Sequence, residues 1–178
     1  MKFISRIILF HIMRWKVVNT FPSLNKYVII AAPHTSWQDF PIGILAKLAI
    51  PLKANYVGKA TLFKPPFGFI FRWLGGAPID RSKSNNKVQA IVDIFNAKEE
   101  FILAMSPEGT RQKVDKWRTG FYYIAKGAKV PIVMITLDFK YKQIKISDPY
   151  VTTNDMEIDF KHFHQYFDGV EGKHPELY

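Results

Sequence analysis

The chain has 178 residues and no cysteine, which excludes disulfides, thiolate metal sites, iron–sulfur clusters and a cysteine nucleophile. With 48% apolar and 22% charged residues it falls in the globular range, which excludes a disordered or fibrous chain. The net charge is +10, and residues 1–98 account for it with 14 basic against 3 acidic residues. This one-sided charge favours a polyanionic partner (nucleic acid, an anionic membrane surface or a phosphorylated substrate), unless it serves solubility alone.

Residues 1–20 combine apolar and basic side chains and predict an N-terminal helix. The longest uncharged apolar stretch, 7–13, lies between Arg6 and Arg14 and is far shorter than the ~20 residues that a membrane span needs. Because no acidic residue precedes Asp39, the segment is typical of a helix that lies in a membrane interface. Its charges do not collect on one side, however, so a helix packed on the domain explains the pattern equally well.

Strand and helix signals alternate along the rest of the chain. Short apolar runs predict strands at 27–32, 53–57, 101–105 and 130–139, and residues 141–146 could pair with the last as a hairpin. A helix is expected behind an N-cap at Ser84, since Val88, Ile91, Val92 and Phe95 recur at helical spacing. Further helices are expected over 121–126 and near the C-terminus, where Asn154 or Asp155 can be the N-cap. This order predicts a single α/β domain over residues 1–178, in which helices flank a largely parallel or mixed central sheet.

Ligands of an open α/β sheet bind beyond the carboxyl ends of its strands, so the loop after 27–32 is a candidate site. It contains His34 and Asp39, whose spacing of five places them on one face of neither a helix nor a strand. If Ser36 is the N-cap of the next helix, Asp39 lies in its first turn and its carboxylate can reach back to the imidazole. The pair would then work as a general base, although Ser36 and Asp39 could also serve helix capping alone.

Two further loops place arginines beyond strand ends. Arg81 follows a glycine-rich segment at 75–80, and Arg111 ends the segment Ser-Pro-Glu-Gly-Thr-Arg after strand 101–105. Arginine binds phosphate with two parallel hydrogen bonds, so the two side chains could clamp an anion. An exposed arginine on a turn, or an ion pair between Glu108 and Arg111, explains either loop by itself.

These loops contain three of four ordered blocks: His-four-residues-Asp at 34–39, GGAPIDR at 75–81, PEGTR at 107–111 and VPIV at 130–133. In this set the chain resembles the glycerolipid acyltransferases, which include the lysophosphatidic acid and related lysophospholipid acyltransferases, and especially a compact bacterial branch. The resemblance covers residues 28–140, the expected catalytic core. It departs from the family pattern in having Trp37 and Gln38 inside the first block and in lacking the spanning helix of many relatives.

The resemblance implies an enzyme of the 1-acylglycerol-3-phosphate O-acyltransferase type. His34, oriented by Asp39, would deprotonate a lysophospholipid hydroxyl, which then attacks the thioester of acyl-CoA or acyl-carrier protein without an acyl-enzyme. The acceptor phosphate would be bound by Arg81 with help from the residues Glu108, Gly109, Thr110 and Arg111. The family needs no metal or other cofactor, and the chain would work as a peripheral protein at the cytoplasmic face of an anionic membrane.

Two other interpretations stay open from the sequence. A non-catalytic basic protein that binds lipids or membranes would show the same charge, although the intact His34 and Asp39 disfavour it. A nucleic-acid-binding module is disfavoured because no reading helix, zinc finger or RNA-binding signature is present. The aromatic segment 62–74 carries more apolar side chains than a short connection normally buries, so contact with lipid is a further expectation there.

Overall fold

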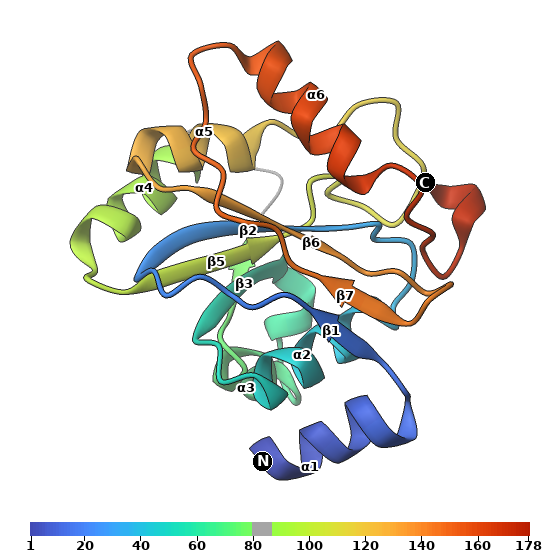
Figure 1. Cartoon of the computed structure of the whole chain (residues 1–178). Coiled ribbons are helices and arrows are strands. Elements are labelled where there is room, and N and C mark those ends of the chain that lie inside the picture. Colours follow the sequence, from blue (N-terminus) through green and yellow to red (C-terminus); the bar gives the residue numbers. More distant parts are fainter. Residues whose placement is uncertain (80–86) are drawn as a thin grey trace.

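A parallel sheet forms the centre of the computed structural model, which describes residues 1–79 and 87–178 (Figure 1). Within these residues the sheet has five strands in the order β4-β3-β5-β2-β6. Their bounds are Lys26–Ala32 for β2, Ala54–Lys59 for β3, Gly76–Ile79 for β4, Phe101–Met105 for β5 and Ile132–Thr136 for β6. Each neighbouring pair is parallel, so the predicted α/β class is confirmed.

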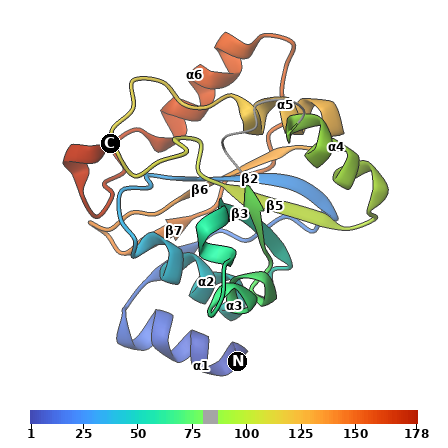
Figure 2. The same cartoon turned by 180° about the vertical axis from the view of Figure 1, so that it is seen from behind.

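Two helical layers cover the sheet, one on each face (Figures 1 and 2). The N-terminal layer comprises α1 (Lys2–Arg6), η1 (Ile7–Ile12), α2 (Asp39–Ala49), η2 (Ala60–Phe63) and α3 (Gly68–Trp73). The C-terminal layer comprises α4 (Lys87–Ala97), α5 (Gly120–Ala128) and α6 (Met156–Phe167). A last short turn, η3 (Pro175–Leu177), lies close to the C-terminus.

Strand β2 supplies side chains to the cores under both layers. Tyr27 and Ile29 pack in the core below the N-terminal layer, whereas Val28 and Ile30 pack in the core below the C-terminal layer. Successive side chains of a strand point to opposite faces, so a strand between two layers must be apolar at every position. This explains why the continuous run at 27–32 correctly predicted a central strand.

The N-terminal segment differs from the predicted helix over residues 1–20. The helical part ends at Ile12, the chain turns at Arg14 with φ of 59°, and strand β1 (Lys16–Val18) follows. The turn lets Trp15 become buried with its ring against Phe139, 5.1 Å between centroids. The helix thus ends ahead of a buried indole that belongs to the core.

The hairpin expected from 141–146 is only partly present. Antiparallel bridges join Ile135 to Ile146 and Asp138 to Gln143, as a hairpin requires. The strand itself, β7 (Gln143–Lys145), instead pairs in parallel with β1 and forms a small second sheet. The N-terminal segment therefore completes this edge of the domain.

The remaining helices lie near their predicted positions. Asp155 is the N-cap of α6 and accepts hydrogen bonds from the backbone N–H groups of Glu157 and Ile158, so the predicted cap is confirmed. Helix α5 runs one residue past Gly127 and ends before Lys129, whose φ of 53° is left-handed. The apolar recurrence predicted α4 correctly, while its proposed cap Ser84 lies outside the described residues.

Candidate active site

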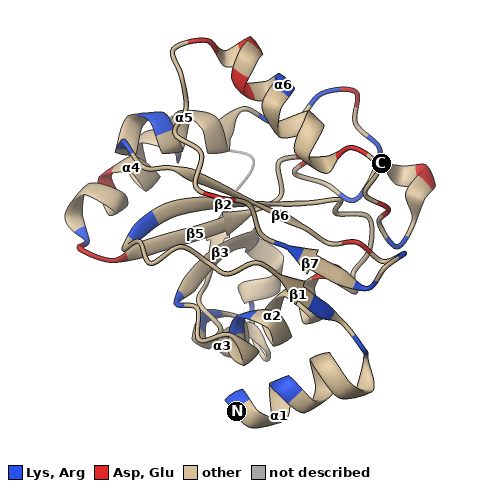
Figure 3. Cartoon of the chain, viewed as in Figure 1, with Lys and Arg blue, Asp and Glu red and all other residues tan. Residues whose placement is uncertain are grey.

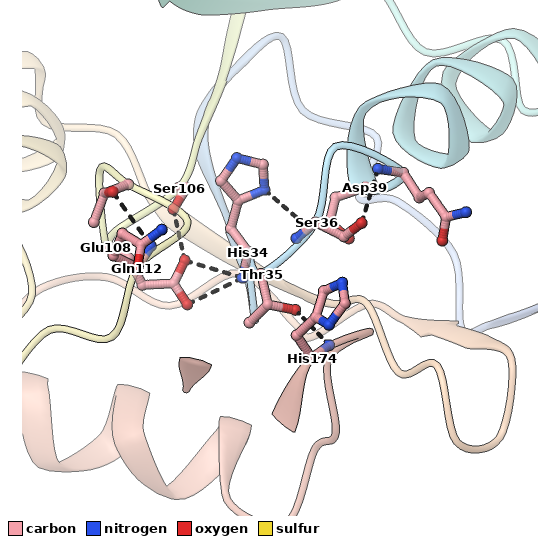
Figure 4. A network of polar contacts seen from close by, with 10 residues as sticks. His34, Thr35, Ser36, Asp39, Ser106, Glu108, Gln112 and His174 are labelled. Atoms are coloured by element: carbon pink, nitrogen blue, oxygen red, sulfur yellow. Dashed lines mark hydrogen bonds and ion pairs between the residues drawn. The ribbon is translucent and has the colours of Figure 1, made fainter. Parts of the chain in front are cut away.

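Two loops meet at the carboxyl edge of the sheet, because β2 and β5 are neighbouring parallel strands. The loop after β2 carries His34 and leads into α2, whereas the loop after β5 carries Glu108. Figure 4 shows both loops from close by, with the imidazole of His34 between Asp39 and the Glu108 loop. Parallel pairing therefore brings together residues that are 74 positions apart.

His34 and Asp39 form the centre of this arrangement. The imidazole Nδ1 of His34 lies 3.0 Å from Oδ2 of Asp39. The Asp39 side chain is 2% exposed, whereas that of His34 is 25% exposed. A carboxylate at Nδ1 holds the hydrogen of the neutral ring on this atom, so the lone pair is on Nε2. The contact produces an oriented imidazole whose other nitrogen can accept a proton.

A tight turn delivers Asp39 to the histidine. The backbone N–H of Ser36 donates to Oδ2 of Asp39 at 2.9 Å, and Oγ of Ser36 accepts from the N–H of Gln38 at 3.2 Å. The N-cap of α2 is Gln38, so the prediction that Ser36 caps the helix was wrong. Ser36 starts the turn ahead of the helix, while Asp39 lies in the first turn as expected.

Glu108 is buried beside the same loop. Both of its carboxylate oxygens accept from the backbone N–H of His34 at 3.0 Å, and one accepts from Oγ of Ser106 at 2.8 Å. Burial raises the pKa of Glu108, and the hydrogen bonds from His34 and Ser106 oppose that rise. The carboxylate thus fixes the main chain of the residue whose side chain Asp39 orients.

Comparison with known proteins identifies the family of this chain and a solved structure with a similar fold. The family model described as "Acyltransferase" matches residues 14–138, more than half of the chain. The chain belongs to the acyltransferase family. Among solved structures, a 1-acyl-sn-glycerophosphate (LPA) acyltransferase, PlsC, from Thermotoga maritima has a similar fold, with a TM-score of 0.62 and 19% identity. The similarity covers 93% of this chain and 74% of that one. A search of curated proteins found no match.

The rest of the Glu108 loop was predicted to bind substrate in this acyltransferase. Gly109 has φ of 69°, a left-handed conformation that favours glycine, and a Cβ there would make a tight contact of 3.2 Å with Cγ of Arg118. Thr110 Oγ1 accepts from the N–H of Gln112 at 3.3 Å, which tightens the turn. Arg111, the last residue of the PEGTR segment, is exposed, whereas the side chain of Glu108 faces His34 and Ser106.

The other two blocks have different outcomes. Arg81 lies outside the described residues, so its expected place beyond β4 stays a prediction. The glycines ahead of it are described: Gly75 has φ of 88°, and a Cβ on Gly76 would lie 2.7 Å from the Tyr56 ring. The fourth block, residues 130–133, leads into β6, and Val130, Ile132 and Val133 are buried in the core.

The C-terminal segment also packs against the site, a contact that the sequence did not indicate. The backbone N–H of His174 donates to Oγ1 of Thr35 at 3.1 Å. Gly172 packs so closely that a Cβ would lie 2.6 Å from the same Thr35 oxygen and 3.1 Å from Pro33. Residues 172–174 therefore brace the loop that carries His34, and no local motif marks a contact over 139 positions.

A cavity of about 380 Å³ adjoins Glu108 on the side of the C-terminal layer. Its lining includes Val114, Trp117, Phe167 and Tyr178, together with acidic side chains such as Asp115. Burial raises the pKa of the Tyr178 hydroxyl, with the charges of Glu108 and Asp168 adding to the effect. A partly apolar space therefore adjoins the Glu108 loop.

The described residues contain neither a candidate metal site nor a candidate membrane-spanning helix. Across 1–79 and 87–178, no three His, Asp or Glu side chains come together as metal ligands would. Within the same ranges, no helix has both the length and the apolar character needed to cross a bilayer.

Proposed function

We propose that this acyltransferase moves a fatty acyl group from an acyl thioester to a hydroxyl of a lysophospholipid such as 1-acyl-glycerol-3-phosphate. The donor would be acyl-CoA or acyl-carrier protein. The contact between Nδ1 of His34 and Oδ2 of Asp39 carries the proposal, because it prepares an imidazole for general-base catalysis. Membership of the acyltransferase family supports the type of reaction.

In the proposed mechanism, Nε2 of His34 removes the proton from the acceptor hydroxyl as its oxygen attacks the thioester carbonyl. The carbon–sulfur bond of the resulting tetrahedral intermediate then breaks, and the leaving thiolate takes the proton from His34. Asp39 stabilises the transient imidazolium, so the cycle returns a neutral histidine, an ester and a free thiol. No acyl-enzyme is needed, in keeping with a chain that has no cysteine.

The acceptor phosphate is assigned to Arg81, with Arg111 adding positive charge from the Glu108 loop. Gly109 and Thr110 would shape the loop so that its backbone approaches the substrate, and Glu108 would keep His34 in register. This assignment rests on the resemblance in blocks 75–81 and 107–111 and on the phosphate geometry of arginine. The cavity beside Glu108 offers space for the apolar part of the donor. We expect no metal or other cofactor.

The acceptor lipids reside in a membrane, and the N-terminal helix is proposed as the segment that reaches it. Phe3, Ile4 and Ile12 are exposed on α1 and η1, while Lys2 and Arg6 supply positive charge. Such a combination suits the interface of an anionic bilayer. The protein would thus be peripheral, at the cytoplasmic face, with no nucleic-acid partner.

The second candidate function is a basic protein that binds lipids or membranes without catalysis. The exposed apolar residues of α1 support it, because binding to a membrane through them needs no catalysis. Product analysis separates the two. The purified protein is incubated with acyl-CoA or acyl-carrier-protein donors of several chain lengths and with a panel of lysophospholipids. Mass spectrometry that detects a two-chain phospholipid supports transfer and identifies donor and acceptor, whereas binding without any product would refute it.

A further inference from the structure

The connection between β3 and β4 exposes a group of large apolar side chains. Their exposed fractions lie between 38% and 68%, and the residues are Leu62, Phe67, Phe69, Ile70 and Trp73. We call these five residues the crossover patch. Monomeric globular proteins rarely leave so many large apolar residues exposed within one short segment, and such a patch marks an interaction surface.

The crossover is anchored from below, so the patch does not result from a loose loop. Phe63 is buried, and the Phe71 ring packs on Phe63 and on Phe40 of α2, with centroid distances of 6.0 and 5.8 Å. Arg72 Nη1 donates to the carbonyl oxygen of Phe63 at 2.9 Å, and Gly68 packs directly against the same peptide. These contacts hold the crossover in a defined conformation.

Helical geometry explains which side chains face outwards. Positions 69, 70 and 73 fall within about 100° on a helical wheel, whereas Phe71 falls about 160° from both 69 and 73. Since Phe71 is the residue that packs on α2, the turn of α3 directs Phe69, Ile70 and Trp73 away from the domain. The exposed parts of these side chains are available to another surface.

The charges around the patch select the chemistry of that surface. Residues 40–79 contain five lysines and arginines and no acidic residue. Lys59, Lys64 and Arg72 are exposed in or beside the crossover, whereas Lys47 is directed inwards and donates to the carbonyl oxygen of Leu74. Figure 3 shows blue segments in this region and no red segment on α3. Apolar side chains fringed by cations match an anionic lipid surface.

The patch also has a suitable position in the fold. Helices α1 and α3 both lie in the N-terminal layer, on the same side of the sheet (Figures 1 and 2). The crossover leaves β3 at the carboxyl edge, the same edge at which β2 ends before His34. Because β4 is parallel to β3, the crossover then returns to the opposite edge, so a bilayer that contacts its first part would lie near the edge where the site is built.

We propose that the crossover patch inserts into an anionic lipid surface as a second contact, separate from the N-terminal helix. Phe67, Phe69 and Trp73 enter the acyl boundary, while Lys59, Lys64 and Arg72 meet the headgroups. The proposal extends the proposed function, since it adds a docking element of this chain that the reaction itself does not require. Binding to vesicles can be measured without turnover, so the two proposals fail separately.

The first test measures partition of the full chain into vesicles of equal parts phosphatidylglycerol and phosphatidylcholine by sedimentation. We expect the triple variant Phe67→Ser, Phe69→Ser and Trp73→Ser to bind at least tenfold more weakly than the wild type. The matched control replaces Val151 and Ile158, which are exposed on the other side of the sheet, by serine and should bind as the wild type does. Equal loss in both variants, or no loss in the crossover variant, would overturn the proposal.

The second test reports on Trp73 itself in an otherwise folded protein. Trp15 and Trp117 are buried, so in a Trp37→Phe background Trp73 is the exposed indole that can respond to lipid. Its emission should shift to shorter wavelength on addition of the anionic vesicles, and the shift should vanish in Trp73→Phe. An unchanged emission maximum would contradict insertion. If the wild type instead forms a dimer that the triple variant loses, the patch belongs to a second copy of the chain and the lipid proposal is wrong.

Discussion

The two helical layers of the domain contrast in charge and in the exposure of their apolar residues. Residues 1–79, which include the N-terminal layer, contain ten lysines and arginines and one acidic residue, the buried Asp39. Residues 99–178 contain 12 acidic and 11 basic residues. On α6 of the C-terminal layer, Phe163 and Phe167 are fully buried, whereas on α1 Phe3 is 74% exposed.

This difference separates stability from contact with other molecules. The C-terminal layer buries most of its aromatic side chains against the sheet and one another, as in the ring contacts of Phe121 with Phe160 and Phe163, although Tyr123 is 49% exposed. The N-terminal layer directs part of its apolar surface outwards beside positive charge, which adds nothing to the core. The candidate site lies where both layers meet the sheet edge: His34 precedes α2, Asp39 is the first residue of α2, and Glu108 precedes α5.

We expect the largest effect from replacing His34, which should abolish catalysis without changing the stability or the membrane contacts of the two layers. His34→Ala should lower acyl transfer by ~10²- to 10⁴-fold or more, because general-base assistance is lost. Its melting temperature and vesicle binding should match the wild type, since His34 is partly exposed and belongs to neither core. The control is His162→Ala on α6, which should keep full turnover. Near-normal turnover of His34→Ala would refute the mechanism.

The second effect concerns Arg81, which the resemblance places on the acceptor phosphate. Arg81→Lys keeps the charge but loses the two-pronged hydrogen bonding, so the KM for the acceptor should rise by roughly ten- to a hundredfold. The KM for the donor should stay nearly constant. A structural arginine would instead lower the melting temperature and affect both substrates alike, so kinetics with each substrate beside a thermal melt distinguish the two roles.

The third effect tests the role of the C-terminal layer in stability. Asp159 is buried and accepts from the Tyr150 hydroxyl at 2.7 Å and from the Thr153 N–H at 2.9 Å. Asp159→Asn should lower the free energy of unfolding by about 1–3 kcal/mol, because these donors lose a charged acceptor. Vesicle binding by the folded variant should be unchanged. If Asp159→Asn also weakened vesicle binding, stability and membrane contact would not be divided between the two layers.

The pH dependence of this third effect has a defined sign. Burial raises the pKa of Asp159, but the hydrogen bonds from Tyr150 and Thr153 outweigh it and leave the pKa below its usual value. A carboxyl with a lowered pKa in the folded state stabilises the protein above its unfolded pKa of about 4 and loses this contribution as the pH falls through the folded value. Chemical denaturation should therefore show the gap between wild type and Asp159→Asn narrowing in acid. A gap of constant size would contradict an ionised Asp159.

We expect the smallest effect from replacing the exposed apolar side chains of the N-terminal helix. Phe3→Ser with Ile4→Ser should weaken binding to anionic vesicles by about tenfold and leave the melting temperature unchanged, because both side chains are exposed. High salt should release only part of the wild type, since it screens the charges and not the apolar contact. Deleting residues 1–18 would weaken binding too, but it also removes the buried Leu9 and Trp15. Wild-type binding by the double variant would remove the interfacial role from α1.

The sequence predicted the elements that depend on local pattern. The apolar run of β2, the recurrence in α4 and the Asp155 cap each rest on residues within a few positions of one another. The pairing of His34 with Asp39 was also accessible, because one turn determines it.

Contacts between distant segments could not be predicted from local pattern. After the N-terminal helix, Trp15 packs on Phe139 and β1 pairs with β7, and both contacts join segments more than 120 positions apart. Glu108 was expected to serve the substrate loop, yet its carboxylate holds the backbone of His34. The bracing of Thr35 by His174 likewise depends on the tertiary fold.

If His34 is the general base for acyl transfer from a thioester to a lipid hydroxyl, both products of the reaction must depend on it, so we would measure the two products together. Wild-type protein and His34→Ala are each incubated with an acyl thioester and 1-acyl-glycerol-3-phosphate, and the free thiol and two-chain phospholipid are quantified together. We expect equal amounts of free thiol and two-chain phospholipid for the wild type, and background levels of both for His34→Ala. Thiol release without phospholipid, or phospholipid formation that survives the substitution, would contradict this role of His34.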